Sequence, residues 1–291
     1  MAAGVEKGIV AMSQSSQGQP SVNALTPGQV EEAVDAAAEK KVATPLPRLL
    51  VSAMFAGAFI GFGALFFIVV TSDSSLSFAA GKLLGGLAFC LGLVLVLCCG
   101  SELFTGNSLM VSGAMEHRIG WGAMLKNWAI VWVGNLLGAA VAVVLVSAAG
   151  ILDLNGGAAG TTAIAVAAAK ISPDWFTLFF RGILCNIFVC LAVRIGFAAR
   201  SVADKVLGIL LPISAFVACG FEHCVANMFF LPVGLVAKLS GYALPGSGAD
   251  PSVVNVGGVL YNLSAATLGN IVGGAIFVGL AYWFVQGHHK D

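Results

Sequence analysis

Six long apolar runs dominate the pattern of hydrophobic and polar positions along this chain. They span roughly residues 48–70, 83–115, 121–149, 175–198, 206–238 and 256–285. A bilayer core about 30 Å thick requires about 20 apolar residues in a crossing helix. Each run meets this length, so the pattern predicts six transmembrane helices. The second and fifth runs are too long for one straight crossing, and a polar, glycine-rich motif interrupts each of them.

The two interrupting motifs share the skeleton Cys-Gly-x-Glu-x4-Asn. They read CGSELFTGN at 99–107 and CGFEHCVAN at 219–227. A second pair follows in the same order, because NWAIVWVGN ends at Asn135 and NLSAATLGN ends at Asn270. Two matches in one order predict an internal duplication with three spans in each copy, over about 46–149 and 175–286. An odd number of spans inverts the second copy in the membrane, and such repeats place the substrate path where broken helices meet.

The segments outside this six-span domain (46–286) are polar. Thr26, Pro27 and Gln29 form a capping box ahead of helically spaced apolar positions, which predicts an amphipathic helix over 26–45. Residues 1–25 are expected to form a disordered tail, and 287–291 a short tail.

Lysine and arginine positions predict the orientation. With six spans, one side holds ten basic residues: Lys7, Lys40, Lys41, Arg48, Arg118, Lys126, Arg194, Arg200, Lys205 and Lys290. The other side holds four: Lys82, Lys170, Arg181 and Lys238. Both termini are therefore expected in the cytoplasm, with the protein in the inner or plasma membrane.

Composition agrees with a membrane protein. The chain has 291 residues, of which 58% are hydrophobic and 10% charged, against about 25% charged in soluble domains. A formal net charge of zero gives no indication of a nucleic-acid partner. The seven cysteines lie in apolar runs without a CxxC pair, so we expect packing residues rather than a disulfide or metal framework. No cofactor, metal or enzymatic activity is expected.

Charged residues inside a span require an explanation, since burying an ionisable group there is costly. Glu102 and Glu222 lie at the two predicted breaks, where each carboxylate could accept hydrogen bonds from unpaired N–H groups of the following half-helix. A supporting role is therefore expected for both, together with Asn135 and Asn270. His223 differs because its repeat counterpart is Leu103. The duplicated scaffold does not require it, which favours a functional histidine.

Five motifs together resemble the formate–nitrite transporter family, most closely its formate-channel branch. They are CGSELFTGN, NWAIVWVGNLLGA, RGILCNIFVCLAV, GFEHCVANMFFLPVG and TLGNIVGG, and the resemblance covers about Leu46 to Trp283. It implies a homopentamer of aquaporin-like, six-span protomers with one pore in each. It also implies passage of small monovalent anions or their protonated acids: formate first, then nitrite, acetate, lactate and hydrosulfide.

The resemblance also implies roles for individual residues. His223 would be the central pore histidine and Thr105 its hydrogen-bonding partner, held by Asn186 and Asn227. Lys170 would be a vestibule lysine that attracts anions. Apolar constrictions would be formed by Leu93 and Leu103 on one side, and by Phe89 and Phe216 on the other. The chain departs from the family pattern at Gly106, Asn107 and Ser108, which bears on the mobility of the loop after Thr105.

Two chemistries and several other protein classes fit these residues. The histidine could lend a proton so that formic acid crosses, or it could stabilise the anion electrostatically. A water or glycerol channel shares the broken-helix plan, but proline-containing turns are expected there and neither break has one. A metal site or membrane enzyme would use His223, Cys219 and Cys224, without a second histidine nearby. A purely structural scaffold would leave the broken helices unexplained.

Overall fold

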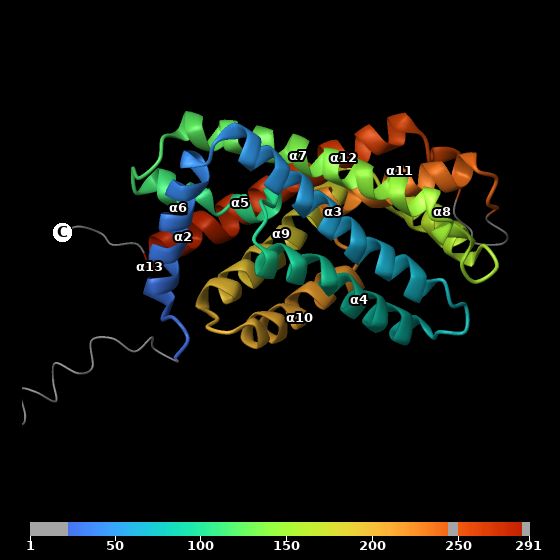
Figure 1. Ribbon diagram of the computed structural model, residues 1–291, viewed down its shortest axis with the longest axis horizontal. Helices are drawn as coiled ribbons and strands as arrows, with labels where there is room; N and C mark the ends of the chain where they lie inside the picture. The colour runs from blue at the N-terminus through green and yellow to red at the C-terminus, as the bar shows by residue number, and fades with distance from the viewer. Residues whose placement is uncertain (1–22, 244–249, 287–291) are drawn as a thin grey trace, which may run out of the picture.

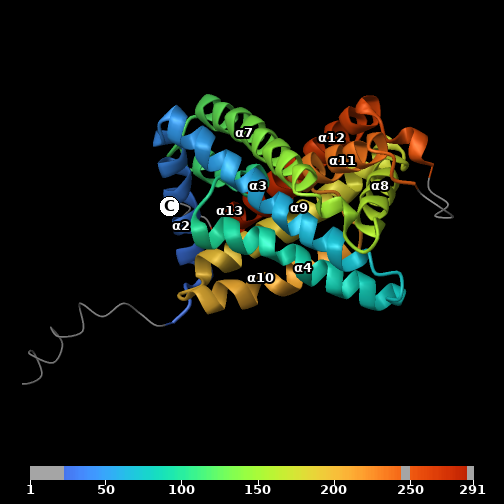
Figure 2. The same ribbon diagram turned by 45° about the vertical axis from the view of Figure 1, so that its right-hand side comes forward.

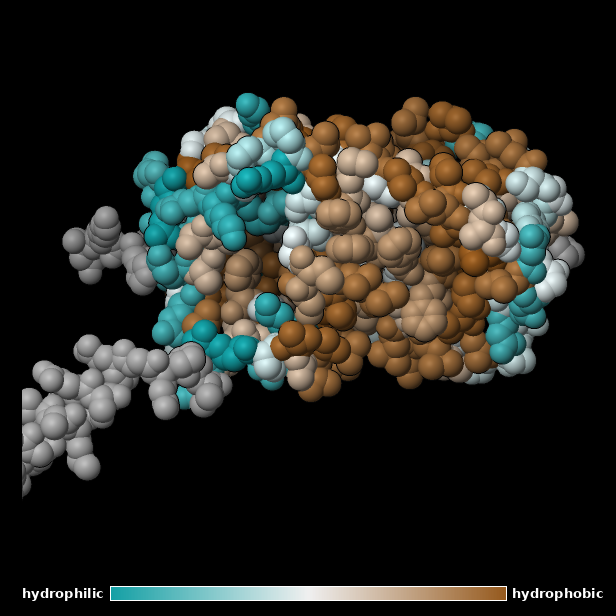
Figure 3. All heavy atoms as spheres, in the orientation of Figure 1, coloured by the Kyte–Doolittle hydropathy of each residue, from teal (hydrophilic) through white to brown (hydrophobic). Residues whose placement is uncertain are grey.

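The computed structural model describes residues 23–243 and 250–286, where all regular secondary structure is helical. Five helices in these ranges are long and apolar enough to cross a membrane: α3 (Leu46–Thr71), α4 (Phe78–Cys99), α7 (Trp121–Ala148), α9 (Trp175–Ala198) and the run from α12 into α13 (Val256–Gln286). Hydrophobic residues cover the middle of the visible face, and hydrophilic residues gather at its two ends (Figure 3). The chain is thus a multi-pass membrane protein.

The long helices form two groups that pack on each other. Helix α3 contacts α4 and α7, and α9 contacts α12 and α10 (Val202–Ala218). Contacts between α4 and α10 join the groups. Two further helices, α2 (Pro27–Ala43) and α8 (Ala158–Ile171), lie at opposite ends of the molecule (Figures 1 and 2). We call these ends the α2 side and the α8 side.

The second and fifth apolar runs are broken where the sequence predicts. Helix α4 ends at Cys99, and its C-cap residue Gly100 has φ of 75°. The chain then continues to α5 (Phe104–Asn107) and α6 (Met110–Met115). After α10, Gly220 has φ of 71° before α11 (Cys224–Leu239) begins. Glycine adopts this left-handed conformation without the steric cost that a Cβ brings. The fifth run is therefore two helices of 17 and 16 residues rather than one crossing helix.

Two features differ from the predicted helix pattern. Helix α8 has only 14 residues, too few to cross a bilayer. The sequence analysis did not predict it, because it lies between the third and fourth apolar runs. The last run contains a π-helical segment, η3 (Val272–Leu280). A Cβ at Gly274 in this segment would lie 2.3 Å from Asn186 Nδ2. The segment therefore brings its backbone close to the residues around the first break, and π-helical turns are frequent at functional sites.

Helix α2 carries the capping box predicted from the sequence. Thr26 Oγ1 accepts from Gln29 N, and Gln29 Oε1 accepts from Thr26 N. The predicted disordered tail falls mostly outside the described residues, which begin at 23, and the tail at 287–291 falls entirely outside them.

Two buried carboxylates attach α2 to the rest of the protein. Arg194 Nη1 donates to Glu31 Oε2 at 2.5 Å. The Ser112 hydroxyl lies 2.6 Å from Glu31 Oε1 and 2.7 Å from Asp35 Oδ1. Burial raises the pKa of Asp35 to about 6, although the hydrogen bond from Ser112 opposes the shift. One hydroxyl has only one proton to donate, so a proton on Asp35 allows both carboxyl groups to be satisfied.

Candidate functional site

His223 and Thr105 meet between the two helix breaks. Thr105 lies on α5 and His223 is the N-cap residue of α11. Thr105 Oγ1 lies 3.1 Å from His223 Nε2, and both side chains are buried. Residues 118 positions apart in the chain therefore meet in one buried polar contact.

A backbone contact assigns the tautomer of His223. Its Nδ1 accepts a hydrogen bond from Ala226 N at 3.0 Å, so this nitrogen carries no proton. In the neutral imidazole the proton then lies on Nε2, which donates toward Thr105 Oγ1. A doubly protonated ring would set Nδ1–H against the Ala226 N–H. The helix cap therefore favours a neutral histidine with a donor at the centre of the protein.

Asn186, on α9, holds the loop that carries Thr105. Its Nδ2 lies 3.2 Å from Thr105 O, 3.2 Å from Ser108 Oγ and 2.6 Å from Asn270 O. These contacts link the first break to α12, which carries Asn270. Asn186 is completely buried, so it acts on the site through the backbone and not by lining an open space.

Asn135 and Asn270 support the breaks directly, with matching hydrogen bonds. Asn135 Oδ1 accepts from Phe104 N at 2.9 Å, and Asn270 Oδ1 accepts from Cys224 N at 2.8 Å. The Nδ2 group of each also donates to a glutamate carbonyl, that of Glu102 or Glu222. Each asparagine thus satisfies an N–H at the start of a half-helix and a carbonyl of the extended segment before it.

The glutamates support the breaks differently from the sequence expectation. Their carboxylates accept from side chains and not from N–H groups of the half-helices. Glu222 accepts from Asn227 at 2.6 Å, from Asn262 at 3.1 Å and from Lys170, whose Nζ is 3.3 Å from both oxygens. The half-helix N–H groups are already taken by the asparagines and by His223, which leaves the carboxylates free to bind the lysine.

The first break repeats this arrangement around Glu102. Its Oε2 accepts from Lys41 Nζ at 2.8 Å and from Asn107 Nδ2 at 2.9 Å. Asn107 also donates to Asn127, and Asn127 donates to the Lys41 carbonyl. Asn227, Asn262 and the Lys170 carbonyl are bonded in the same way. The sequence analysis did not identify Lys41 as a site residue. Its pairing with Glu102, which corresponds to the pairing of Lys170 with Glu222, forms only when α2 folds against the break.

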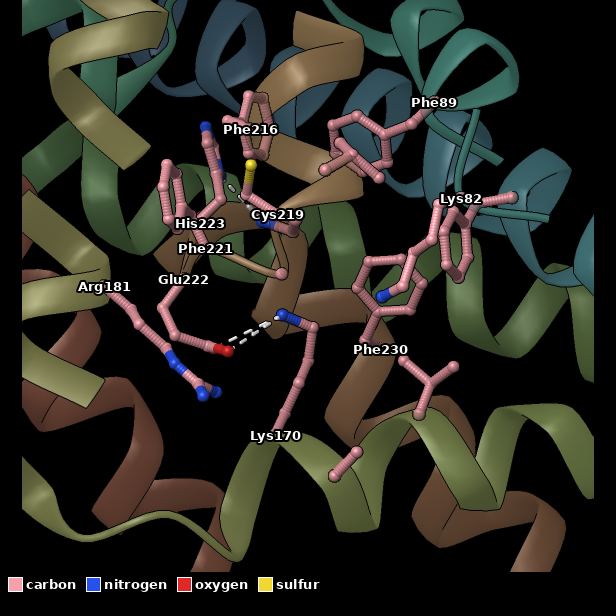
Figure 4. A pocket seen from close by; sticks show the side chains of 16 residues that line it. Lys82, Phe89, Lys170, Arg181, Phe216, Cys219, Phe221, Glu222, His223 and Phe230 are labelled. Carbon is pink, nitrogen blue, oxygen red and sulfur yellow. Dashed lines mark hydrogen bonds and ion pairs between the residues drawn. The ribbon is translucent and has the colours of Figure 1, made fainter. Parts of the chain in front are cut away.

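Two cavities approach the His223–Thr105 pair from opposite sides. The α8-side cavity has a volume of about 290 Å³ and reaches His223 past Lys170 and Cys219 (Figure 4). The α2-side cavity measures about 90 Å³ and is lined by Lys41 among others. Between them lies a void of about 10 Å³ that touches His223. His223 thus lies on a line of cavities that is nearly closed at its middle.

The residues predicted to form apolar constrictions line the cavities on both sides of His223. Phe89 and Phe216 belong to the α8-side cavity, with ring centroids 5.7 Å apart. Leu93 and Leu103 belong to the α2-side cavity. The structure therefore places the four residues predicted as constrictions in two pairs flanking the histidine.

The structure does not gather the residues of the alternative metal site. Cys219 is exposed at the α8-side cavity, whereas Cys224 is buried. Within residues 23–243 and 250–286, no group of three or more His, Cys, Asp or Glu side chains is placed to hold a metal ion.

The sequence profile of the formate/nitrite transporter family matches residues 28–284. This chain therefore belongs to the formate/nitrite transporter family, whose members are membrane transporters and channels rather than enzymes.

Named relatives and solved structures agree with this assignment. The chain is 41% identical to a probable formate transporter of Methanothermobacter thermautotrophicus, over 89% of this chain and 96% of that protein. It is 38% identical to the formate channel FocA of Escherichia coli K12, over 82% and 86%. It is 34% identical to the nitrite transporter NirC of the same strain, over 80% of this chain and 82% of that protein.

Among solved structures, a pentameric formate channel with formate bound is 38% identical, with a TM-score of 0.73 over 82% of this chain and 97% of that one. An ion channel of the same family is 31% identical, with a TM-score of 0.76 over 88% and 98%.

Proposed function

We propose that this protein conducts formate, and related small monovalent anions or their protonated acids, across the inner or plasma membrane. The observation that carries the proposal is the His223–Thr105 contact of 3.1 Å between two cavities. Two relatives named for formate and a solved channel with formate bound support formate as the first substrate.

We further propose six crossings in two inverted repeats of three helices, with an aquaporin-like plan. The paired hydrogen bonds at the two breaks support this proposal, since Asn135 bonds at the first break as Asn270 does at the second. Glu102 likewise pairs with Lys41 as Glu222 does with Lys170. The crossings would be α3, α4 with α5 and α6, α7, α9, α10 with α11, and α12 through α13. A homopentamer is proposed by analogy with the pentameric formate channel.

The positive-inside pattern of basic residues supports an orientation in which both termini and the α2 side face the cytoplasm. The α8-side cavity would then open to the outside.

The narrow part of the proposed path selects through desolvation. A bare carboxylate loses several kcal/mol of hydration free energy in an apolar site, even after relaxation. His223 lines the small void between the Phe89–Phe216 and Leu93–Leu103 pairs. The donors that this residue and its partner can supply are the His223 Nε2–H and the Thr105 hydroxyl. These donors can bind a carboxylate oxygen of formate. They can equally bind the carbonyl oxygen of formic acid, which forms when formate takes up a proton from solvent in the cavity. Cations find no acceptor charge there.

Nitrite is the second candidate substrate. It is a planar monovalent oxyanion like formate, and the nitrite transporter NirC is among the relatives. The same two donors could bind it.

Uptake by purified protein in proteoliposomes tests the proposal. We expect labelled formate and nitrite to equilibrate at least about tenfold faster than chloride, because each tenfold ratio needs only about 1.4 kcal/mol of difference between barriers. Glycerol uptake should match that of protein-free vesicles. Fast glycerol uptake with no formate uptake would assign the chain to neutral solutes, and chloride moving as fast as formate would contradict selection at the histidine.

A further inference from the structure

The α8-side cavity contains more positive charge than its ion pair accounts for. Its lining includes Lys82, Lys170, Arg181 and one carboxylate, that of Glu222. Glu222 binds Lys170 with both oxygens, so the charge of that lysine is largely compensated. Two positive charges, on Lys82 and Arg181, remain without a carboxylate partner among the residues that the structure describes.

Arg181 is placed at the inner part of this cavity. It lies in the second turn of α9, on a membrane-crossing helix, and its side chain extends toward the region where Lys170 and Glu222 meet (Figure 4). Its carbonyl accepts a hydrogen bond from Glu222 N at 3.3 Å. The backbone of Arg181 is thus tied to the extended segment that ends at His223, which fixes its distance from the narrow part of the path.

The fold itself does not require an arginine at this position. At the first break the corresponding bond runs from Glu102 N to the carbonyl of Ser52, at 3.4 Å. Arg181 therefore has a serine as its structural counterpart, as His223 has Leu103. An ionisable residue inside a crossing helix, without a partner of opposite charge, indicates a functional site.

The chemistry of the guanidinium group indicates what binds there. Its planar fork of N–H donors matches two oxygens of a carboxylate in a bidentate pair, whereas an ammonium group is a compact point charge. Within residues 23–243 and 250–286, no hydrogen bond or ion pair occupies the donors of the Arg181 side chain. The Lys82 ammonium instead lies 5.6 Å from the Phe78 ring centroid, toward the rim.

We propose that Arg181 is the outer binding residue for planar, bidentate oxyanions, which it holds in the α8-side cavity before they reach His223. The proposal rests on the proposed function, because it names the group that selects the substrate at the mouth of that path. Formate and nitrite present two oxygens to the fork, whereas a halide presents a single spherical charge. Arg181 thus contributes selection by shape, and Lys170 with Glu222 contributes a fixed, nearly neutral wall.

The test measures formate uptake into proteoliposomes as a function of formate concentration. Arg181→Gln should raise the half-saturating concentration about tenfold, the typical effect of removing one charge-assisted pair. Arg181→Lys should restore part of this affinity through its charge. It should nevertheless lose the preference for nitrite over bromide as a competitor of formate uptake. Arg48→Gln is the matched control, since it removes the same charge from an exposed position on the α2 side, and it should leave both values unchanged.

The outcomes separate this inference from the proposed function. If the wild-type protein takes up no formate, both fail. If it takes up formate while Arg181→Gln keeps the wild-type half-saturation, or while Arg48→Gln shifts it equally, only the role of Arg181 is overturned. If Arg181→Gln does not assemble, the comparison of nitrite with bromide in Arg181→Lys decides, and an unchanged preference would overturn selection by shape.

Discussion

Replacing His223 by Phe should lower formate uptake by about tenfold or more, with little change in assembly. The variant removes the Nε2–H donor from a site where apolar side chains exclude water. A hydrogen bond to a charged group typically contributes about 1.5–3 kcal/mol, which corresponds to about 10- to 100-fold in rate or affinity. Formate uptake by protein of verified oligomeric size is the measurement.

Two further variants separate the functional donor from the helix cap. His223 also accepts the Ala226 N–H, so Phe removes a cap as well as a donor. Asn is a good N-cap residue, so His223→Asn should preserve stability while still reducing uptake. Thr105→Ala should reduce uptake only a few-fold, since a water molecule could replace one hydroxyl. Normal assembly with wild-type uptake in both His223 variants would show that formate passage does not depend on the histidine.

Glu222→Ala should lower the free energy of unfolding by about 3 kcal/mol or more. The substitution leaves the Lys170 ammonium without its counter-charge, and the amide groups of Asn227 and Asn262 each lose one of their two acceptors. Breaking a buried ion pair on one side typically costs about 3–5 kcal/mol. Denaturation of the detergent-solubilised protein by SDS, followed by loss of helical signal, would measure the difference.

Three controls define the cause of this loss. Glu102→Ala should be milder, because the Glu102 and Lys41 side chains are 17% and 22% exposed, against 2% for Glu222 and 16% for Lys170. Glu222→Gln should fall between Ala and wild type, since its amide oxygen still accepts while its NH2 group faces other donors. Glu222→Ala combined with Lys170→Met should recover part of the stability, since no unpaired ammonium remains. A Glu222→Ala protein as stable as wild type would remove the carboxylate from the support of the break.

The sequence predicted those parts of the fold that depend on local pattern. The length of the apolar runs predicted the five helices that are long enough to cross a membrane in the described residues. The Cys-Gly-x-Glu motifs predicted both breaks, because Gly100 and Gly220 can adopt positive φ. Contacts between segments far apart in the chain were harder to predict from the sequence. The glutamates were expected to bind backbone N–H groups, but Asn135 and Asn270 occupy those groups, and no local pattern shows which acceptor is nearer.

The pairing of charged side chains could not be predicted from the sequence either. Lys41 counted only toward orientation, since its pairing with Glu102 depends on how α2 folds back on the first break. Arg181 likewise counted as a basic residue outside the cytoplasm, and only the cavity shows that it lacks a carboxylate partner in the described part of the chain. Helix α8 was missed because 14 alanine-rich residues satisfy neither the length of a crossing helix nor a clear amphipathic pattern.

Blocking Cys219 tests most directly whether formate crosses each protomer through the cavity that ends at His223. Cys219 is exposed and lines the α8-side cavity together with Lys170 and Arg181. Purified protein is treated with a charged methanethiosulfonate reagent before reconstitution, so the orientation in the vesicles does not matter. The control is Cys219→Ser, which keeps the exposed Cys98 and Cys99. We expect modified wild-type protein to lose most formate uptake, excess formate to slow the modification, and the treated control to transport normally. Complete modification of Cys219 with unchanged formate uptake would contradict this path.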